Sequence, residues 1–104
     1  MIKVLNAFSL SMVQMPAIVQ ARILEREELK SRLAAGFESF IGHESLCPLL
    51  REMFDVSIFV NRQSVRLERG EEAVVFQYTG PRLPEGVTSL PEGSELVPML
   101  ITVS

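Results

Sequence analysis

Short apolar segments typical of β-strands alternate along this chain with two stretches of helical pattern. This alternation predicts a mixed domain in which helices cover a β-sheet. We expect helices over residues 25–35 and from residue 44 or 45 to residue 54. The extended segments are expected at residues 2–5, 17–23, 37–41, 56–60, 65–67, 73–78 and 96–103.

Both helical stretches carry signals that begin, stabilise and end a helix. In the first, acidic residues occupy the N-terminal turn, where they suit the helix dipole, and Gly36 can end the helix. Glu28 and Arg32 have the spacing of an ion pair on one helix face. In the second, Pro48 is tolerated because the N–H group that proline lacks has no partner in a first helical turn. The second stretch also has an apolar stripe for burial, made of Leu46, Leu49, Leu50, Met53 and Phe54.

The C-terminal part of the chain combines a predicted hairpin with loops. Residues 65–67 and 73–78 are expected to pair as a hairpin. Residues 80–86 are too rich in proline and glycine for a helix or a strand, so we expect a loop there. Pro98 lacks the N–H group that a sheet ladder uses, which predicts an edge position or a bulge in the last strand.

The chain is predicted to be one domain, residues 1–104, of the α+β class with α/β-like character. An apolar fraction of 47% argues against disorder. We expect a mixed sheet of about five strands with both main helices packed on one face. Since two helices cannot cover both faces well, we expect a second copy of the chain to cover remaining apolar surface, which makes the protein a homodimer.

Charge and residue supply exclude several classes of function. The net charge of −3 does not favour non-specific binding to nucleic acid, so duplex DNA is a possible but disfavoured partner. The single cysteine, Cys47, excludes an intrachain disulfide and a thiolate zinc site, and one histidine is a poor basis for a metal site. No metal and no cofactor are therefore expected. The absence of a signal-peptide pattern and of a membrane-length apolar run predicts a cytoplasmic protein, in the host cytoplasm if it is viral.

The only histidine, His43, lies where a predicted strand gives way to the second predicted helix. N–H groups and the dipole at a helix N-terminus attract phosphate. A histidine there can donate a proton to a departing oxygen near neutral pH, provided that a phosphate or carboxylate offsets the dipole's effect on imidazolium. The alternative is a structural histidine that bonds locally at the start of the helix.

Charged residues elsewhere could complete a phosphate site around this histidine. Glu85, between a proline and a glycine, is the candidate carboxylate. Arg82 could bring a guanidinium to the same site, and Arg62 and Arg66 are further candidates, because guanidinium binds phosphate through paired charge-assisted hydrogen bonds. The alternative for each is an exposed side chain that serves solubility.

Small polar residues near the first and later strands are further candidates for ligand binding. Asn6, Ser9 and Ser11 follow the first strand and could bind ribose hydroxyls or phosphate, or could instead form a turn. Gln77 interrupts an apolar strand. Its side chain is expected either on the solvent face or directed at a ligand.

Four short motifs occur in an order that resembles a known family: Asn6-Ala7-Phe8-Ser9-Leu10, Ile41-Gly42-His43-Glu44, Val60-Asn61-Arg62 and Arg82-Leu83-Pro84-Glu85-Gly86. With Val75-Phe76-Gln77 before the fourth motif, the pattern is similar to that of the type III anti-CRISPR ring nucleases, small proteins of archaeal viruses, phages and some bacteria. Those proteins destroy the second messenger cyclic tetra-adenylate. The resemblance covers residues 1 to about 86.

The resemblance implies a metal-independent, phosphodiester-cleaving homodimer that holds cyclic tetra-adenylate on its two-fold axis. A ribose 2′-hydroxyl would attack the adjacent phosphorus and give linear di-adenylate with a 2′,3′-cyclic phosphate. By motif match, His43 would be the general acid, and Glu85 would help to set His43 or the attacking hydroxyl. The residues that would contact phosphate or sugar are Arg62, Arg82 and Gln77, with Asn6 and Ser9 on the opposite side.

Two other functions compete with this interpretation. One is a DNA-binding regulatory dimer of a virus or phage, which would show affinity for duplex DNA that falls steeply with salt. The other is a protein that binds the cyclic nucleotide without cleaving it, which would return the ligand unchanged.

Overall fold

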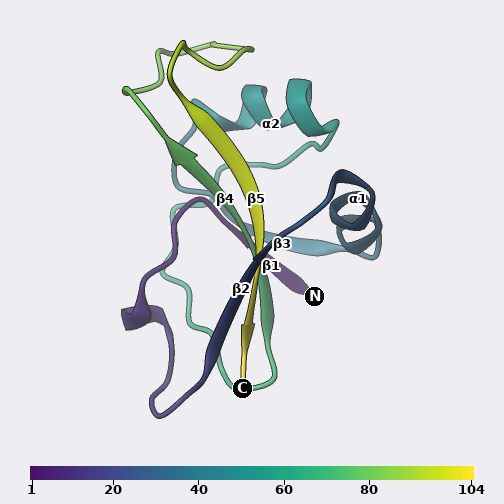
Figure 1. Ribbon diagram of the computed structural model, residues 1–104, viewed down its shortest axis with the longest axis vertical. Coiled ribbons are helices and arrows are strands. Elements are labelled where there is room, and N and C mark those ends of the chain that lie inside the picture. The colour runs from purple at the N-terminus through teal and green to yellow at the C-terminus, as the bar shows by residue number, and fades with distance from the viewer.

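A computed structural model describes residues 1–104 and shows one mixed β-sheet with two α-helices (Figure 1). The strands are β1 (Ile2–Leu5), β2 (Val19–Ile23), β3 (Phe37–Phe40), β4 (Glu72–Thr79) and β5 (Glu95–Val103). The helices are α1 (Arg26–Ala34) and α2 (Leu46–Phe54), and a 3₁₀ turn covers Leu10–Met12. The predicted α+β architecture is confirmed. Neither helix is long and apolar enough to span a bilayer.

Four strands of the sheet run in the same direction, and only β5 runs the opposite way. The strand order is β2-β5-β4-β1-β3. β1 is parallel to both of its neighbours, with Val4 opposite Ser39 of β3 and Val74 of β4. β5 is antiparallel to β4 and to β2. The C-terminal ends of β1, β3 and β4 therefore meet at one edge of the sheet, the place where open α/β sheets bind ligands.

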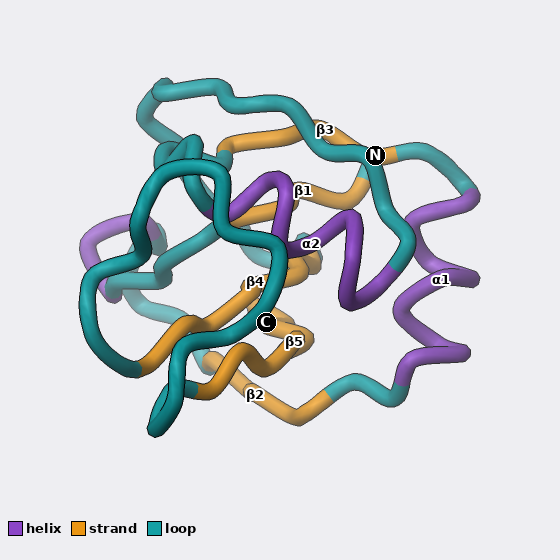
Figure 2. Tube along the Cα trace, turned by 90° about the horizontal axis from the view of Figure 1, so that it is seen from above, coloured by secondary structure: helices purple, strands orange, loops and turns teal.

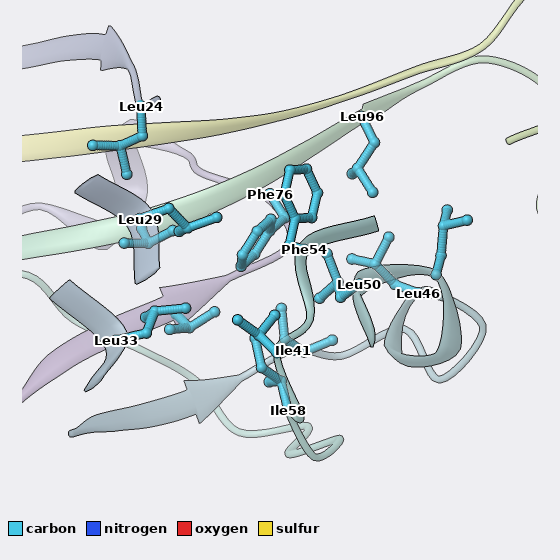
Figure 3. Packing of buried hydrophobic residues seen from close by; sticks show 14 of the residues in the cluster. Leu24, Leu29, Leu33, Ile41, Leu46, Leu50, Phe54, Ile58, Phe76 and Leu96 are labelled. Carbon is cyan, nitrogen blue, oxygen red and sulfur yellow. The ribbon is translucent and has the colours of Figure 1, made fainter. Parts of the chain in front are cut away.

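Both helices pack on the same face of the sheet, as predicted (Figure 1). Leu29 of α1 and Leu50 of α2 belong to one buried cluster that also contains Val74 and Phe76 of β4. Figure 3 shows Phe54 at the end of α2 beside Phe76, with ring centroids 5.6 Å apart. This cluster fixes α2 against the sheet, so the N-terminus of α2 has a defined position beside the ends of the parallel strands.

Loops rather than helices cover the opposite face. A second buried cluster there consists of strand and loop residues: Leu5, Ala73, Val75, Ile101 and Val103 from the strands, and Val13 and Leu67 from the loops. A single parallel bridge joins Val13 to Leu67. Large apolar side chains remain exposed in the segments near this face, namely Leu10, Met15 and Ile18. The chain therefore has apolar surface beyond what its own core uses.

The predicted hairpin between residues 65–67 and 73–78 is wrong. β4 pairs with β1 and β5 instead, and Leu67 contributes only its bridge to Val13. β4 lies between β1 and β5, and its side chains from Ala73 to Phe76 are buried on both faces of the sheet. A hairpin with the short, polar segment around Leu67 would not have offered that burial.

The edge position or bulge predicted at Pro98 is wrong, because β5 lies between β2 and β4 and its register with β4 runs through Pro98 without a bulge. β5 lies inside the sheet, but β2 pairs with it only from Met99 to Val103. The Pro98 carbonyl accepts a hydrogen bond from the Leu24 N–H at 2.9 Å, so the side of Pro98 without an N–H group faces the point where β2 ends. The β2–β5 ladder therefore ends at this proline.

Candidate functional site

A pocket of about 520 Å³ lies at the edge of the sheet where the parallel strands end. Its lining residues are Gly42, His43, Glu44, Ser45, Arg62, Arg82, Leu83, Pro84 and Glu85. The residues come from the β3–α2 connection, the segment after α2 and the loop after β4. The structure thus brings together His43, Arg62, Arg82 and Glu85, which come from three separate segments of the chain.

His43 lies just before α2, with an exposed side chain. Its carbonyl accepts a hydrogen bond from the Leu46 N–H at 3.1 Å, so the backbone already turns as a helix there. The N–H groups of His43, Glu44 and Ser45 make no hydrogen bond within the chain, and Ser45 provides no side-chain cap. Free donors and the positive end of the helix dipole therefore lie beside the pocket, which suits an anion.

Asn6 and Arg62 hold the residue before His43 from two sides. The Gly42 N–H donates to Asn6 Oδ1 at 2.9 Å, and Arg62 Nε donates to the Gly42 carbonyl at 3.1 Å. Asn6 does not line the pocket itself. The two terminal nitrogens of Arg62 make no hydrogen bond within the chain, so they are available to a ligand.

The loop between β4 and β5 carries Arg82 and Glu85 to the pocket. Viewed from above, this loop passes close to α2 (Figure 2). Leu83 anchors the loop because its side chain is buried in the cluster that contains α2. The Tyr78 hydroxyl adds a hydrogen bond to the Pro81 carbonyl. With Leu83 pointing inward, its neighbours Arg82 and Glu85 stay exposed at the pocket.

The charged groups of the pocket are not consumed by ion pairs within the chain. None of the intrachain salt bridges involves Arg62, Arg82 or Glu85. Two guanidinium groups and free N–H donors can bind phosphate oxygens, an imidazole can transfer a proton, and a carboxylate can orient either group. No cluster of three or more His, Cys, Asp or Glu side chains that could hold a metal ion is present.

Cys47 lies near the pocket but has the properties of a structural thiol. Its side chain is half-buried, and it packs against the main core cluster. Burial, with a smaller contribution from Glu44, raises the pKa of the Cys47 thiol. The thiol is therefore protonated near neutral pH and is a poor nucleophile.

The other predicted ligand contacts lie outside this pocket: Asn6, Ser9, Ser11, Arg66 and Gln77. Ser9 caps the 3₁₀ turn, because its Oγ accepts a hydrogen bond from the Ser11 N–H at 3.3 Å. The two serine hydroxyls are also hydrogen-bonded to each other at 3.0 Å. The two serines therefore stabilise a local turn.

Arg66 and Gln77 are exposed on the surface. The Arg66 carbonyl accepts a hydrogen bond from Lys3 Nζ at 2.8 Å, whereas its side chain has no partner within the chain. Gln77 shares its strand face with Val75 by alternation, so it lies on the side of the sheet opposite the helices. Neither residue lines the pocket.

Sequence reasoning missed two residues that hold the pocket together, Ser39 and Asn61. Asn61 Nδ2 donates to the Ser39 carbonyl at 2.9 Å, between β3 and the segment that carries Arg62. The available signal was a polar residue inside the apolar run Phe37 to Ile41 and an asparagine next to a candidate arginine. Neither residue lines the pocket, so their contribution could not be seen from residue type alone.

Comparison with known proteins shows similarity to one protein family and to a solved structure. A family model described as STIV B116-like matches residues 2–97. Among solved structures, B116 of Sulfolobus turreted icosahedral virus (STIV) is similar to this chain, with a TM-score of 0.79, 25% sequence identity and coverage of 97% of each chain. No curated protein sequence has a significant match to the chain.

Proposed function

We propose, from the premise that this chain belongs to the STIV B116-like family and from the pocket around His43, that it is a metal-independent ring nuclease. Its substrate would be cyclic tetra-adenylate, and its cleavage would antagonise type III CRISPR signalling. One observation carries the proposal: His43, Glu85, Arg62 and Arg82 line a single pocket at the N-terminus of α2.

The cationic groups of the pocket would bind one phosphodiester of the ring. Arg62 and Arg82 can each give paired hydrogen bonds to phosphate oxygens. The free N–H groups before α2 add further donors and the favourable dipole. Charge that develops on phosphorus-bound oxygens in the transition state would be stabilised by groups already in place.

The substrate would supply the nucleophile. A ribose 2′-hydroxyl attacks the adjacent phosphorus in line, and the bond from phosphorus to the 5′-oxygen breaks. His43 as imidazolium gives its proton to the leaving 5′-oxygen, while the proton of the 2′-hydroxyl passes to Glu85 or to water. The products carry a 2′,3′-cyclic phosphate and a 5′-hydroxyl. Because the protein only aligns, protonates and neutralises, one histidine and a few charged residues suffice.

A homodimer would hold the ring on its two-fold axis. Each subunit would then break one of two opposite phosphodiesters, which gives two linear di-adenylates. Predicted contacts outside the pocket of one subunit would reach the ring in such a dimer: Asn6, Ser9, Ser11, Arg66 and Gln77. The apolar side chains left exposed near the second face, such as Ile18, support association of two copies.

The test is incubation of the protein with cyclic oligoadenylates of several sizes in the presence of EDTA, followed by separation of the products. Cyclic tetra-adenylate should give linear di-adenylate with a 2′,3′-cyclic phosphate. His43→Ala should cleave about 10²–10⁴-fold more slowly, because general acid catalysis is lost. Full activity in that variant would remove His43 from the mechanism.

The chain provides a matched control for Glu85. The sequence Leu-Pro-Glu-Gly occurs at residues 83–86 and again at residues 90–93, but only Glu85 lines the pocket. Glu85→Gln should slow cleavage, whereas Glu92→Gln should not. Tight binding of a ligand that is returned intact would instead identify a cyclic-nucleotide binder, and salt-sensitive affinity for duplex DNA without cleavage would identify a regulatory dimer.

A further inference from the structure

Ser39 and Asn61 join the end of β3 to the segment that follows α2 through three hydrogen bonds, and a fourth links Ser39 to Ile41 within the first segment. Asn61 Nδ2 donates to the Ser39 carbonyl at 2.9 Å, and the Asn61 N–H donates to the Ile41 carbonyl at 2.8 Å. Ser39 Oγ donates to the Phe59 carbonyl and accepts from the Ile41 N–H at 3.3 Å. We call these contacts the Ser39–Asn61 clasp.

The clasp lies next to two pocket residues in the sequence, Arg62 and His43. Asn61 is the neighbour of Arg62, and Ile41 lies two residues before His43. Ile41 is fully buried and Ile58 is buried, so the clasp is fastened to the core cluster (Figure 3). The clasp therefore holds the backbone next to Arg62 against the backbone close to His43.

Val56 and Ile58 pack into the core cluster, but few contacts besides the clasp hold the end of this segment, where Arg62 lies. Residues 55–61 form no regular strand, and Val60 contributes a single bridge to Ile41. Beyond the clasp, the Arg62 Nε bond to the Gly42 carbonyl is the link between this segment and the pocket. Loss of the clasp would therefore let Arg62 move relative to His43 without disrupting the core.

We propose that Ser39 and Asn61 are positioning residues that set the geometry between His43 and Arg62, and thereby align the bound phosphate with its proton donor. The inference rests on the proposed function. A displacement of about 1 Å at a reacting centre can cost roughly 10²-fold in rate, so such residues affect turnover more than binding.

The test compares Ser39→Ala, which removes the hydroxyl, with Ser39→Thr, which keeps it. For Ser39→Ala we expect kcat to fall about tenfold while KM changes less than about threefold. Ser39→Thr should restore most of the rate. Ser31→Ala is the matched control, because Ser31 is exposed on α1 and makes no side-chain hydrogen bond. Thermal unfolding of each variant shows the fraction that is folded at the assay temperature.

A second variant, Asn61→Ala, removes the side-chain half of the Asn61 contacts. Since both residues act on the same geometry, the double variant should lose less rate than the product of the two single losses. A fall in apparent kcat no larger than the unfolded fraction of each variant would mean a merely structural role and would overturn the inference. Unchanged kcat in Ser39→Ala would overturn it too, with the proposed function intact.

A readout without cleavage separates this inference from the proposed function. The backbone amide of Asn61 should exchange its hydrogen faster in Ser39→Ala than in the wild-type protein, because its bond to the Ile41 carbonyl is part of the clasp. If the wild-type protein does not cleave cyclic tetra-adenylate, the proposed function fails, and this measurement still decides about the clasp. Unchanged exchange at Asn61 in Ser39→Ala would contradict the inference.

Discussion

Arg62 uses its guanidinium in two directions. Nε donates to the Gly42 carbonyl, which places the residue before His43, and the terminal nitrogens remain free at the pocket. A lysine carries the same charge but has no equivalent of Nε and no planar fork for phosphate. A lysine at position 62 would therefore keep the positive charge but lose the bond to the Gly42 carbonyl and the paired bonds to phosphate.

Arg62→Lys should weaken ligand binding roughly tenfold, equivalent to about 1.4 kcal/mol. Titration calorimetry with a ligand that cannot be cleaved would measure the loss. Arg69→Lys is the control, because Arg69 is exposed and lies outside the pocket. Equal affinities for the two variants would show that Arg62 contributes only its charge.

Gly80 begins the loop that carries Arg82 and Glu85, and its backbone requires glycine. Its φ is +146°, and a Cβ placed there would lie 2.5 Å from the Cβ of Ser94, where the two arms of the loop meet. Gly70 also has a positive φ, +91°, but a Cβ there would meet nothing within 4 Å.

Gly80→Ala should therefore lower the free energy of unfolding by more than Gly70→Ala, by an additional 1–3 kcal/mol or so. Both variants have the strain of a positive φ, and only the first adds the clash with Ser94. Chemical denaturation measures the difference. Similar losses would mean that the loop relaxes around the new methyl group.

At the level of elements, a charged network attaches α1 to the sheet. Glu28 of α1 accepts hydrogen bonds from Arg22 of β2 at 2.9 and 2.5 Å and from Arg32 at 3.0 Å. Arg32 also donates to Glu72 of β4 at 3.1 Å. The hydrogen bonds from Arg22, followed by those from Arg32, lower the pKa of the Glu28 carboxyl to about 2.

The network makes the docking of α1 dependent on pH. Since the pKa of Glu28 is lower in the folded state, its contribution to stability is present above the ordinary value of 4.5 and is lost as the pH falls toward about 2. Wild type should unfold at a higher temperature than Glu28→Gln at pH 7, with the gap closing between those two pH values. The contribution is modest because the groups are exposed, and salt should reduce it.

Glu27→Gln is the matched control for this prediction. Glu27 lies in the same helical turn but is exposed and takes part in no salt bridge of the network. Its substitution should leave the pH profile of the melting temperature close to that of the wild type. A gap for Glu28→Gln that persists below pH 2 would assign the effect to something other than ionisation.

At the level of the molecule, the proposed dimer predicts how subunits share one substrate. Sedimentation should give twice the 11.6 kDa mass of the chain. In mixtures of wild-type and His43→Ala subunits, mixed dimers hold one functional histidine and break one bond. Linear tetra-adenylate should then accumulate transiently as the fraction of the variant rises. Its absence at every ratio, or a monomeric mass, would contradict a ring held between two subunits.

Local signals predicted most elements of this fold. The spacing of Leu29 and Leu33 and the position of Gly36 defined α1, and the apolar stripe from Leu46 to Phe54 defined α2. Such signals work because helix hydrogen bonds and side-chain periodicity arise within a few residues of each other. The residue types suited to a phosphate site could be recognised in the same way.

Pairings between distant segments could not be predicted in that way. The partners of β4 depend on which neighbouring strands bury both of its faces. The sequence near Leu67 does not show that β1 and β5 pair with β4 in place of that segment. Likewise, nothing local shows that Asn6 holds Gly42 or that Ser39 binds Asn61.

The sequence by itself determined the helices, most of the strands and the candidates His43, Arg62, Arg82 and Glu85. Only the tertiary structure decided that these four side chains share one pocket, while Ser9 and Ser11 form a local turn. The physical reason is that the parallel direction of β1, β3 and β4 brings their C-terminal ends to one edge, and strand direction is set by packing of the whole sheet.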